Sequence, residues 1–268
     1  MMNSWRPSTA IKATVALHAV AGAGILAAPG LWPQALAAIA ANHGVLTAAG
    51  LWPRSTLLGP NFTRLPAAAA ARNEIALTID DGPNPKVTPR VLDLLDAANA
   101  KATFFCIGVE VTRHAGLVRE MIARGHTIEN HSQHHLKIFA ALSPKRMLSE
   151  IAAAQEAIAA TVGRAPRYFR PTAGLRNPFL DPILARLDLK LVSWTRRPFD
   201  TRCGDAEQVH KRLTRGLAAG DILLMHDGNA APTNAGHPVI LEALPRLLAT
   251  LRDAGLKSVT LSSALDNH

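Results

Sequence analysis

From Asn73 onward, short apolar stretches alternate regularly with longer amphipathic stretches. The short stretches are typical of strands and the longer ones of helices. Strands are predicted at 74–79, 102–107, 126–129, 168–170, 189–194, 222–225 and 258–261. Helices are predicted between them at 88–98, 109–124, 144–163, 177–187, 206–217 and 241–254.

Seven strands that alternate with helices predict a parallel sheet, because each connection between parallel strands needs a crossover. A complete eight-stranded barrel needs about 250 residues, and the alternating part of this 268-residue chain begins only near residue 71. We therefore expect an α/β fold, an incomplete and distorted parallel β/α barrel of about seven strands, in a domain at 71–268.

The first 70 residues are predicted to form an alanine-rich apolar helical segment and a linker at 66–71. Residues 13–53 contain no Asp, Glu, Lys or Arg, and they hold two apolar stretches at 13–28 and 34–51. A spanning helix needs about 20 apolar residues, so each stretch is slightly short.

Three arrangements fit this segment. A membrane hairpin would place Trp32 and Trp52 at the interface, and the positive residues that flank it would put both ends in the cytoplasm. A signal peptide or signal anchor would use Arg6 and Lys12 as its charged region. The third arrangement is a pair of helices packed on the domain. Membrane association through residues 13–53 is our expectation.

The formal net charge of +9 favours an anionic partner or surface. The basic residues are scattered and aromatic residues make up only 4% of the chain, so we do not expect nucleic acid as a partner. The two cysteines, Cys106 and Cys203, form no Cys-x-x-Cys pair, which argues against a zinc knuckle or a redox motif.

Polar side chains follow most of the predicted strands. Asp80 and Asp81 end the first strand, and the other strands are followed by Asn130–His135, Arg170, Arg197 with Asp200, and His226 with Asp227. Active groups in parallel α/β folds collect at the carboxyl ends of strands. Two adjacent carboxylates are tolerable where one binds a cation and the other handles protons.

His131 and His135 are four residues apart, so a helical turn after the strand would place both imidazoles on one face. Together with one carboxylate they would form a metal site that leaves coordination positions open.

Four motifs resemble the NodB-homology polysaccharide deacetylases, carbohydrate esterase family 4. Residues 78–83 resemble the first motif of that family, with Ile79 where Phe is common, and residues 131–135 are similar to its His-Ser/Thr-x-x-His motif. Residues 169–174 resemble Arg-Pro-Pro-Tyr-Gly, and residues 223–227 resemble Leu-Leu-His-Asp. Order and spacing agree over about residues 73–265.

The resemblance implies one divalent metal ion, zinc or cobalt, held by Asp81, His131 and His135. It also implies roles for five other residues: Asp80 as general base, His226 as general acid, Arg170 as the partner that orients Asp80, Asp200 as the partner of His226, and the Ala173 backbone N–H in the oxyanion hole.

Two departures from the family alter the lining of the substrate groove. Ala173 stands where the family has Tyr, and Arg197 stands where it often has the first Asp of Asp-x-x-Asp-Trp. Arg197 and Arg176 would add positive charge near the rim. We therefore expect a substrate with a phosphate or carboxylate near the scissile acetamide, as in a glycolipid.

The predicted activity is metal-dependent N-deacetylation of an N-acetylated sugar in a polysaccharide, oligosaccharide or glycolipid. Amide hydrolysis needs an activated water, stabilisation of the oxyanion and an acid for the amine. A hydrolase of non-sugar amides and a non-catalytic glycan-binding relic are the alternatives. A non-haem iron oxygenase would also use two histidines and a carboxylate, but it has no need for Asp80 or His226.

Overall fold

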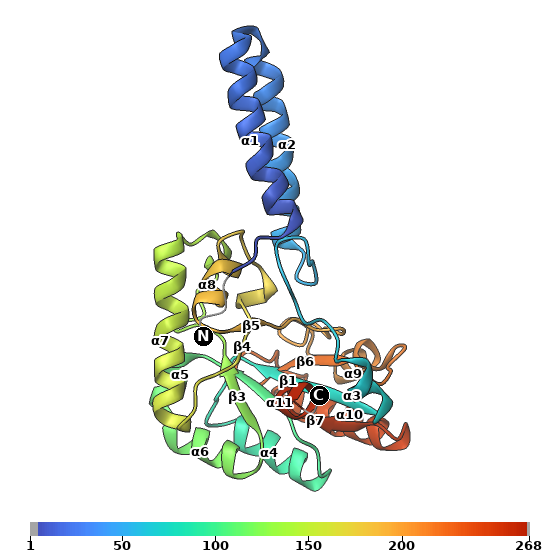
Figure 1. The fold of residues 1–268 in the computed structure, drawn as a ribbon. Coiled ribbons are helices and arrows are strands. Elements are labelled where there is room, and N and C mark those ends of the chain that lie inside the picture. Colours follow the sequence, from blue (N-terminus) through green and yellow to red (C-terminus); the bar gives the residue numbers. More distant parts are fainter. Residues whose placement is uncertain (1–4, 267–268) are drawn as a thin grey trace.

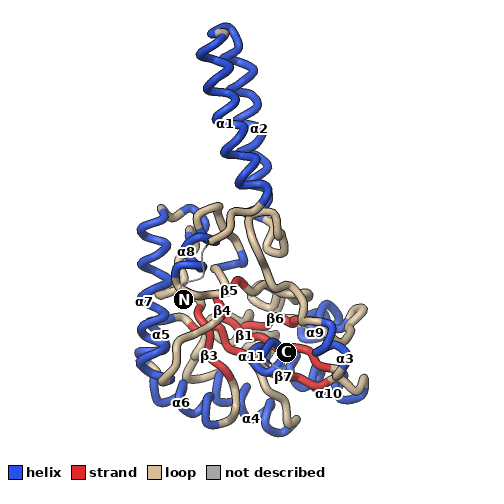
Figure 2. Tube along the Cα trace, viewed as in Figure 1, coloured by secondary structure: helices blue, strands red, loops and turns tan. Residues whose placement is uncertain are grey.

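A curled sheet of seven parallel strands forms the centre of the computed structural model, which describes residues 5–266 (Figures 1 and 2). The strands are β1 (Glu74–Asp80), β2 (Thr103–Cys106), β3 (Thr127–Asn130), β4 (Tyr168–Phe169), β5 (Lys190–Leu191), β6 (Ile222–His226) and β7 (Lys257–Val259). Their order is β5-β4-β3-β2-β1-β6, and β7 pairs with the start of β1.

Irregular backbone bridges the gap between β5 and β6. Phe62 pairs with Val192 just after β5, and Arg196 pairs with Leu223 in β6. The sheet therefore curls without forming a complete ring of strands, and the predicted incomplete parallel barrel is confirmed.

Helices surround the sheet, and they follow the predicted alternation. They are α4 (Thr88–Ala97), α5 (Gly108–Arg113), α6 (Ala115–Ala123), α7 (Pro144–Val162), α8 (Leu180–Arg186), α9 (Ala206–Thr214), α10 (Ile240–Asp253) and α11 (Leu261–Asp266), with short 3₁₀ turns at η2 (Phe139–Ala141) and η3 (Thr172–Gly174). The single helix predicted at 109–124 is broken at His114, whose φ of −122° and ψ of 39° are not helical.

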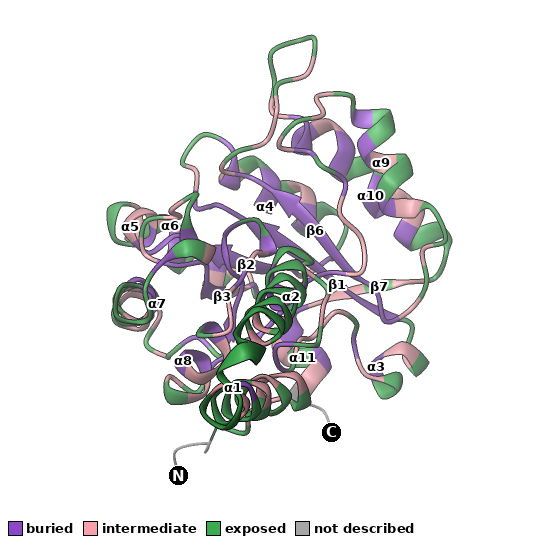
Figure 3. Ribbon diagram, turned by 90° about the horizontal axis from the view of Figure 1, so that it is seen from above, coloured by how far each residue is buried: buried purple, intermediate pink, exposed green. Residues whose placement is uncertain are grey.

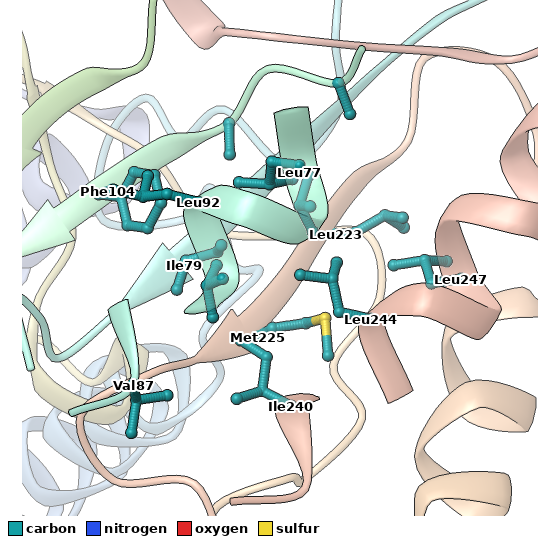
Figure 4. Packing of buried hydrophobic residues seen from close by; sticks show 14 of the residues in the cluster. Leu77, Ile79, Val87, Leu92, Phe104, Leu223, Met225, Ile240, Leu244 and Leu247 are labelled. Carbon is teal, nitrogen blue, oxygen red and sulfur yellow. The ribbon is translucent and has the colours of Figure 1, made fainter. Parts of the chain in front are cut away.

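The alternation of side chains along β1 divides the core from the site. All seven residues of β1 are buried, as expected for a central parallel strand. Leu77 and Ile79 point into the main hydrophobic cluster, where they meet Phe104 and Met225 beneath α4 and α10 (Figure 4). Because side chains of a strand point alternately to its two faces, Thr78 and Asp80 lie on the opposite, inner face.

A helical hairpin projects from the domain. It consists of α1 (Thr9–Ala27), η1 (Pro29–Leu31) and α2 (Trp32–Leu51), and its helices pack on each other with most residues exposed (Figures 1 and 3). Thr14 Oγ1 donates to Asn42 Oδ1 across the pair at 3.2 Å. This arrangement differs from the alternative in which both helices pack on the domain.

The segment predicted as a linker is part of the packed domain. Residues Ala67–Ala71 form helix α3, and Leu65 and Ala69 are buried in a second core cluster with Ala76 and Tyr168. Alanine has the highest helix propensity, and its small side chain lets this helix approach the sheet closely.

Candidate active site

The structure brings the polar residues that follow β1, β3, β4 and β6 to one rim of the sheet. β1 is hydrogen-bonded to both β2 and β6, and Asp80 is in register with His226. The carboxylates at the end of β1 therefore lie between the histidines that follow β3 and the histidine that ends β6.

The three predicted metal ligands converge on one point. Asp81 Oδ1 lies 3.2 Å from Nε2 of His131 and 3.0 Å from Nε2 of His135. All three ligand atoms lie within 4.8 Å of one another. Ligand atoms about 2.1 Å from a tetrahedral ion are about 3.4 Å apart, so the observed separations suit such an ion.

Left-handed backbone conformations aim these side chains at one another. The φ angles are 76° at Asp81, 67° at Ser132 and 51° at His135, a region that non-glycine residues seldom occupy and that clusters at functional sites. The predicted helical turn after β3 is absent, since residues 131–135 form a loop. Two left-handed residues, rather than helical spacing, bring the imidazoles together.

Hydrogen bonds from neighbouring groups hold the side chains of Asp81 and His131 in orientations that suit a bound cation. His131 Nδ1 donates to the Arg170 carbonyl at 2.6 Å, which leaves Nε2 free to bind a metal. Asn229 Nδ2 donates to Asp81 Oδ2 at 3.0 Å, while the buried Asp81 Oδ1 has no hydrogen-bond partner among the described residues. Burial would raise the pKa of Asp81, but the two imidazoles outweigh it and hold that pKa well below its usual range.

Asp80 is held by a fully buried arginine. Arg170 Nη1 donates to Asp80 Oδ1 at 2.6 Å and to Thr78 Oγ1 at 2.9 Å. Its other nitrogens donate to the carbonyls of Val192 and Ser193 at 3.2 and 2.8 Å. Four of the five N–H donors of this buried cation are engaged, so its position is fixed and Asp80 presents Oδ2 to the rim.

His226 forms a buried pair with Asp200. His226 Nδ1 lies 2.8 Å from Asp200 Oδ1, and the His226 backbone N–H donates to Asp200 Oδ2, also at 2.8 Å. Burial alone would lower the pKa of His226, but the hydrogen bond and the negative charge of Asp200 raise it to about 9. The imidazole is therefore protonated at neutral pH, with Nε2 as its available donor.

Ala173 and the two predicted rim arginines have different surroundings. Ala173 is exposed at the turn η3, where its φ is 56°. Arg197 is half-buried beside Trp194 and Phe199. The prediction that Arg176 adds charge to the rim is wrong, because Arg176 is buried and donates to the Ser55 carbonyl at 2.6 Å.

Three residues that support the site were not assigned from the sequence. Thr78 accepts from Arg170 and donates to the Leu223 carbonyl, and Asn229 orients Asp81. Asp227 is buried beneath the first loop, and burial raises its pKa to about 7. Thr78 is the first residue of the first motif and Asn229 follows the last motif by two residues, so their polarity next to buried strands was the available signal.

The glycines beside the carboxylates are required by close approach. A Cβ atom on Gly228 would lie 2.1 Å from the Asp81 carbonyl oxygen, and one on Gly82 would lie 2.5 Å from Asp227 Oδ1. A larger residue at position 228 would therefore displace Asp81, whereas one at position 82 would displace the Asp227 carboxylate.

Comparison with known proteins identifies relatives over most of the chain. The family model described as polysaccharide deacetylase matches residues 67–192. A peptidoglycan-N-acetylglucosamine deacetylase of Bacillus cereus is 34% identical over 193 residues, which cover 71% of this chain and 87% of the relative. A chitooligosaccharide deacetylase of Bradyrhizobium is 34% identical over 155 residues, or 58% of this chain and 70% of the relative.

Solved structures share the fold. A crystal structure of a peptidoglycan N-acetylglucosamine deacetylase superposes with a TM-score of 0.69 and 26% identity, covering 78% of this chain and 94% of that one. Some relatives are longer, and the chain spans only 41% of the peptidoglycan-N-acetylglucosamine deacetylases of Listeria monocytogenes that it matches.

Proposed function

This chain belongs to the polysaccharide deacetylase family of hydrolases, and we propose that it hydrolyses the acetamide of N-acetylglucosamine in a glycan or glycolipid, releasing acetate. The observation that carries this proposal is the convergence at one rim of a cation site, a carboxylate held by Arg170 and a protonated histidine held by Asp200. Relatives named for peptidoglycan and chitooligosaccharide support the choice of sugar.

We propose that Asp81, His131 and His135 hold one divalent ion, zinc or cobalt. The orphaned Asp81 Oδ1 and the two imidazole Nε2 atoms fit such an ion. When bound, the ion would lower the pKa of water to about 7 and polarise the acetamide carbonyl.

Asp80 is the proposed general base. Its Oδ1 accepts from Arg170, so Oδ2 is the oxygen that takes a proton from the attacking water. The salt bridge to Arg170 holds the carboxylate in one orientation, which fixes Oδ2 in position. The water oxygen then forms a bond to the acetamide carbon, and the Ala173 backbone N–H is proposed to donate to the carbonyl oxygen as charge develops there.

His226 is the proposed general acid. Its Nδ1 proton is engaged by Asp200, so Nε2 delivers a proton to the sugar nitrogen as the carbon–nitrogen bond breaks. The products are acetate and a sugar with a free amine. Asp80 and His226 lie in register on neighbouring strands, so the base and the acid flank the same position.

The test of this function is acetate release by the full chain, with added zinc or cobalt, from three kinds of substrate. We expect release from chitooligosaccharide or peptidoglycan fragments and from N-acetylglucosamine glycolipids, accompanied by an equal amount of free amine. N-acetylated amino acids and peptides are the control. Release from those amides alone would overturn the assignment of a sugar substrate.

The substitution Asp200→Asn should move the alkaline limb of the pH–activity profile to lower pH. His226 acts in its protonated form, so activity falls as pH rises through its pKa, which Asp200 raises to about 9. Loss of a neighbouring carboxylate should lower that pKa by about 1–3 units. The measurement is kcat/KM as a function of pH. Asp253→Asn, at a side chain that is 69% exposed, is the control, and an unmoved limb in Asp200→Asn would contradict the pairing.

We propose that the helical hairpin within residues 1–70 attaches the enzyme to a membrane and that residues 71–268 carry the catalysis. Among the described helices, α1 is long and apolar enough to span a bilayer. Large apolar side chains along the hairpin, including Val20, Leu36 and Val45, are exposed. Contiguous exposed apolar surface of this kind marks interaction with lipid or protein. A hairpin places both of its ends on one side, and the positive-inside rule favours the cytoplasmic side.

The double substitution Val20→Asp with Val45→Asp should move the chain from the membrane fraction to the soluble fraction. Each aspartate near a helix centre costs about 3 kcal/mol of membrane insertion. Sedimentation followed by detergent extraction measures the distribution. Ala235→Asp, in an exposed loop of the domain, adds the same kind of charge and should leave the distribution unchanged. Recovery of the unaltered chain in the soluble fraction would refute the proposal.

A further inference from the structure

A pocket of about 350 Å³ lies where the end of the hairpin meets the catalytic rim. Its lining combines residues from two distant parts of the chain, Trp52, Pro53 and Arg54 after α2 and Trp194, Thr195, Arg197 and Phe199 after β5. Figure 1 shows the chain passing directly from α2 down to the domain at this place. The pocket is therefore formed jointly by the N-terminal segment and the catalytic domain.

Hydrogen bonds fix this pocket to the catalytic machinery. Ser193 Oγ donates to the Pro53 carbonyl at 2.5 Å, and the Ser193 carbonyl accepts from Arg170 at 2.8 Å. Arg54 Nη1 donates to the Thr195 carbonyl at 3.4 Å. The group that holds Asp80 is thus two hydrogen bonds away from the pocket wall, and a ligand in the pocket would lie close to the reacting acetamide.

Neither arginine of the pocket forms an ion pair within the described part of the chain, although the carboxylates of Asp80 and Asp200 lie close enough to attract Arg197. Among the residues that line it, Arg54 and Arg197 are cationic and none is acidic. The Arg197 Nε atom is buried and has no hydrogen-bond partner. Its neighbour in sequence differs, because Arg196 Nε donates to the buried Asp221 at 2.6 Å. Arg197 is therefore available for an anion.

Aromatic rings hold the Arg197 guanidinium in place. Its Cζ lies 5.2 Å from the centre of the Trp194 ring and 5.1 Å from that of Phe199. Phe199 is 49% exposed and has a φ of 59°, which is unusual for a bulky residue. Strained conformations of this kind persist where they position a functional group.

We propose that this pocket binds the phosphate of a lipid-linked N-acetylated sugar, with Arg54 and Arg197 on the phosphate and the aromatic rings against the sugar. Guanidinium groups match phosphate with two parallel hydrogen bonds. The pocket follows the last residue of α2, so membrane insertion of the hairpin would place it at the depth of lipid phosphates. The inference rests on the proposed deacetylase function, and it names the class of substrate.

The experiment compares two glycolipids that differ only in the linkage. One carries an N-acetylglucosamine disaccharide on a prenyl chain through a diphosphate, and the other carries the same disaccharide on the same prenyl chain through a neutral glycosidic bond. The full chain is assayed in phosphatidylcholine vesicles, and the ratio of kcat/KM for the two substrates is measured. We expect Arg197→Ala to lower this ratio about 10- to 100-fold, the effect of one charge-assisted hydrogen bond. Arg197→Lys should restore part of it.

A matched control separates this effect from a general loss of charge. Arg252 is exposed on α10, with a side chain that is 78% accessible, and Arg252→Ala should keep the original ratio. An equal effect of Arg197→Ala on both glycolipids would overturn the proposal.

Two further measurements identify the source of the anion. If bulk phospholipid occupies the pocket, adding anionic phospholipid to the vesicles would lower activity on the phosphate-linked substrate, and Arg197→Ala would abolish that inhibition. If the anion is a carboxylate of a polymer, Arg197→Ala would reduce activity on soluble peptidoglycan fragments and spare the diphosphate substrate. Either result would overturn the assignment to a substrate phosphate.

Binding provides a readout that does not depend on turnover. Trp52 and Trp194 line the pocket, so a short-chain diphosphate glycolipid should change the tryptophan fluorescence of the unaltered chain and of Arg252→Ala. The same titration of Arg197→Ala should give a Kd about 10- to 100-fold higher. If the unaltered chain binds the glycolipid but releases no acetate, the deacetylase function alone is refuted. If Arg197→Ala binds the glycolipid as tightly as the unaltered chain, the proposed phosphate site is refuted.

Discussion

Replacing Asp80 by asparagine should lower kcat/KM for N-acetylglucosamine substrates by about 10²- to 10⁴-fold, the usual contribution of a general base. Asparagine has the same shape and still accepts from Arg170 through its amide oxygen, so the buried arginine keeps a partner. The other side-chain atom becomes a nitrogen with no basic lone pair at the place of Oδ2. The fold should therefore survive while proton transfer from water is lost.

Metal content distinguishes this effect from damage to the cation site. Asp80 Oδ2 lies 3.8 Å from His131 Nε2, farther than Asp81 Oδ1 at 3.2 Å, so Asp80 is not expected to be a ligand. Asp80→Asn should bind one equivalent of zinc with near-normal affinity, measured by equilibrium dialysis and elemental analysis. A parallel loss of zinc and activity would instead make Asp80 a ligand, and normal turnover would remove it from the mechanism.

The topology was predictable because the strands are buried and the helices amphipathic. The extent of the strands was less predictable, and β5 shows why. A strand was predicted at 189–194, yet β5 has only two residues, because Val192 leaves to pair with Phe62 and Arg196 pairs with Leu223. The mostly apolar run at 189–194 spans both the part that pairs with β4 and the part that pairs with Phe62. Its sequence pattern therefore does not show where β5 ends.

Within the site, the residues that act as ligands, base and acid were more predictable from the sequence than the residues that hydrogen-bond to them. The spacing of His131 and His135 indicated a cation site, although the loop achieves it through left-handed residues that spacing alone does not reveal. Asn229 and Thr78 act through contacts with segments far away in the sequence, and such contacts leave no local pattern. The position of Trp52 and Arg54 near the rim was likewise not predictable, because it depends on how the hairpin joins the domain.

Replacing His131 by alanine should remove both the metal and the activity. This imidazole supplies one of three converging ligand atoms, and its Nδ1 bond to the Arg170 carbonyl fixes the ring in the binding orientation. Loss of an outer partner of a metal ligand typically costs about 10- to 100-fold in metal affinity. Loss of the ligand itself should therefore exceed about 100-fold, and zinc should be absent after dialysis against buffer.

His134 provides a matched control three residues along the same loop. Its side chain is 55% exposed and its Nδ1 lies 2.8 Å from Glu150 Oε1, so it turns away from Asp81. His134→Ala should keep its zinc and most of its activity, and it removes one hydrogen bond from the buried Glu150 carboxylate, which still accepts from the backbone N–H of residue 134. The contrast tests the geometry of the loop directly. Zinc retained in His131→Ala, or lost in His134→Ala, would mean that the left-handed turns at Ser132 and His135 aim a different imidazole at the cation.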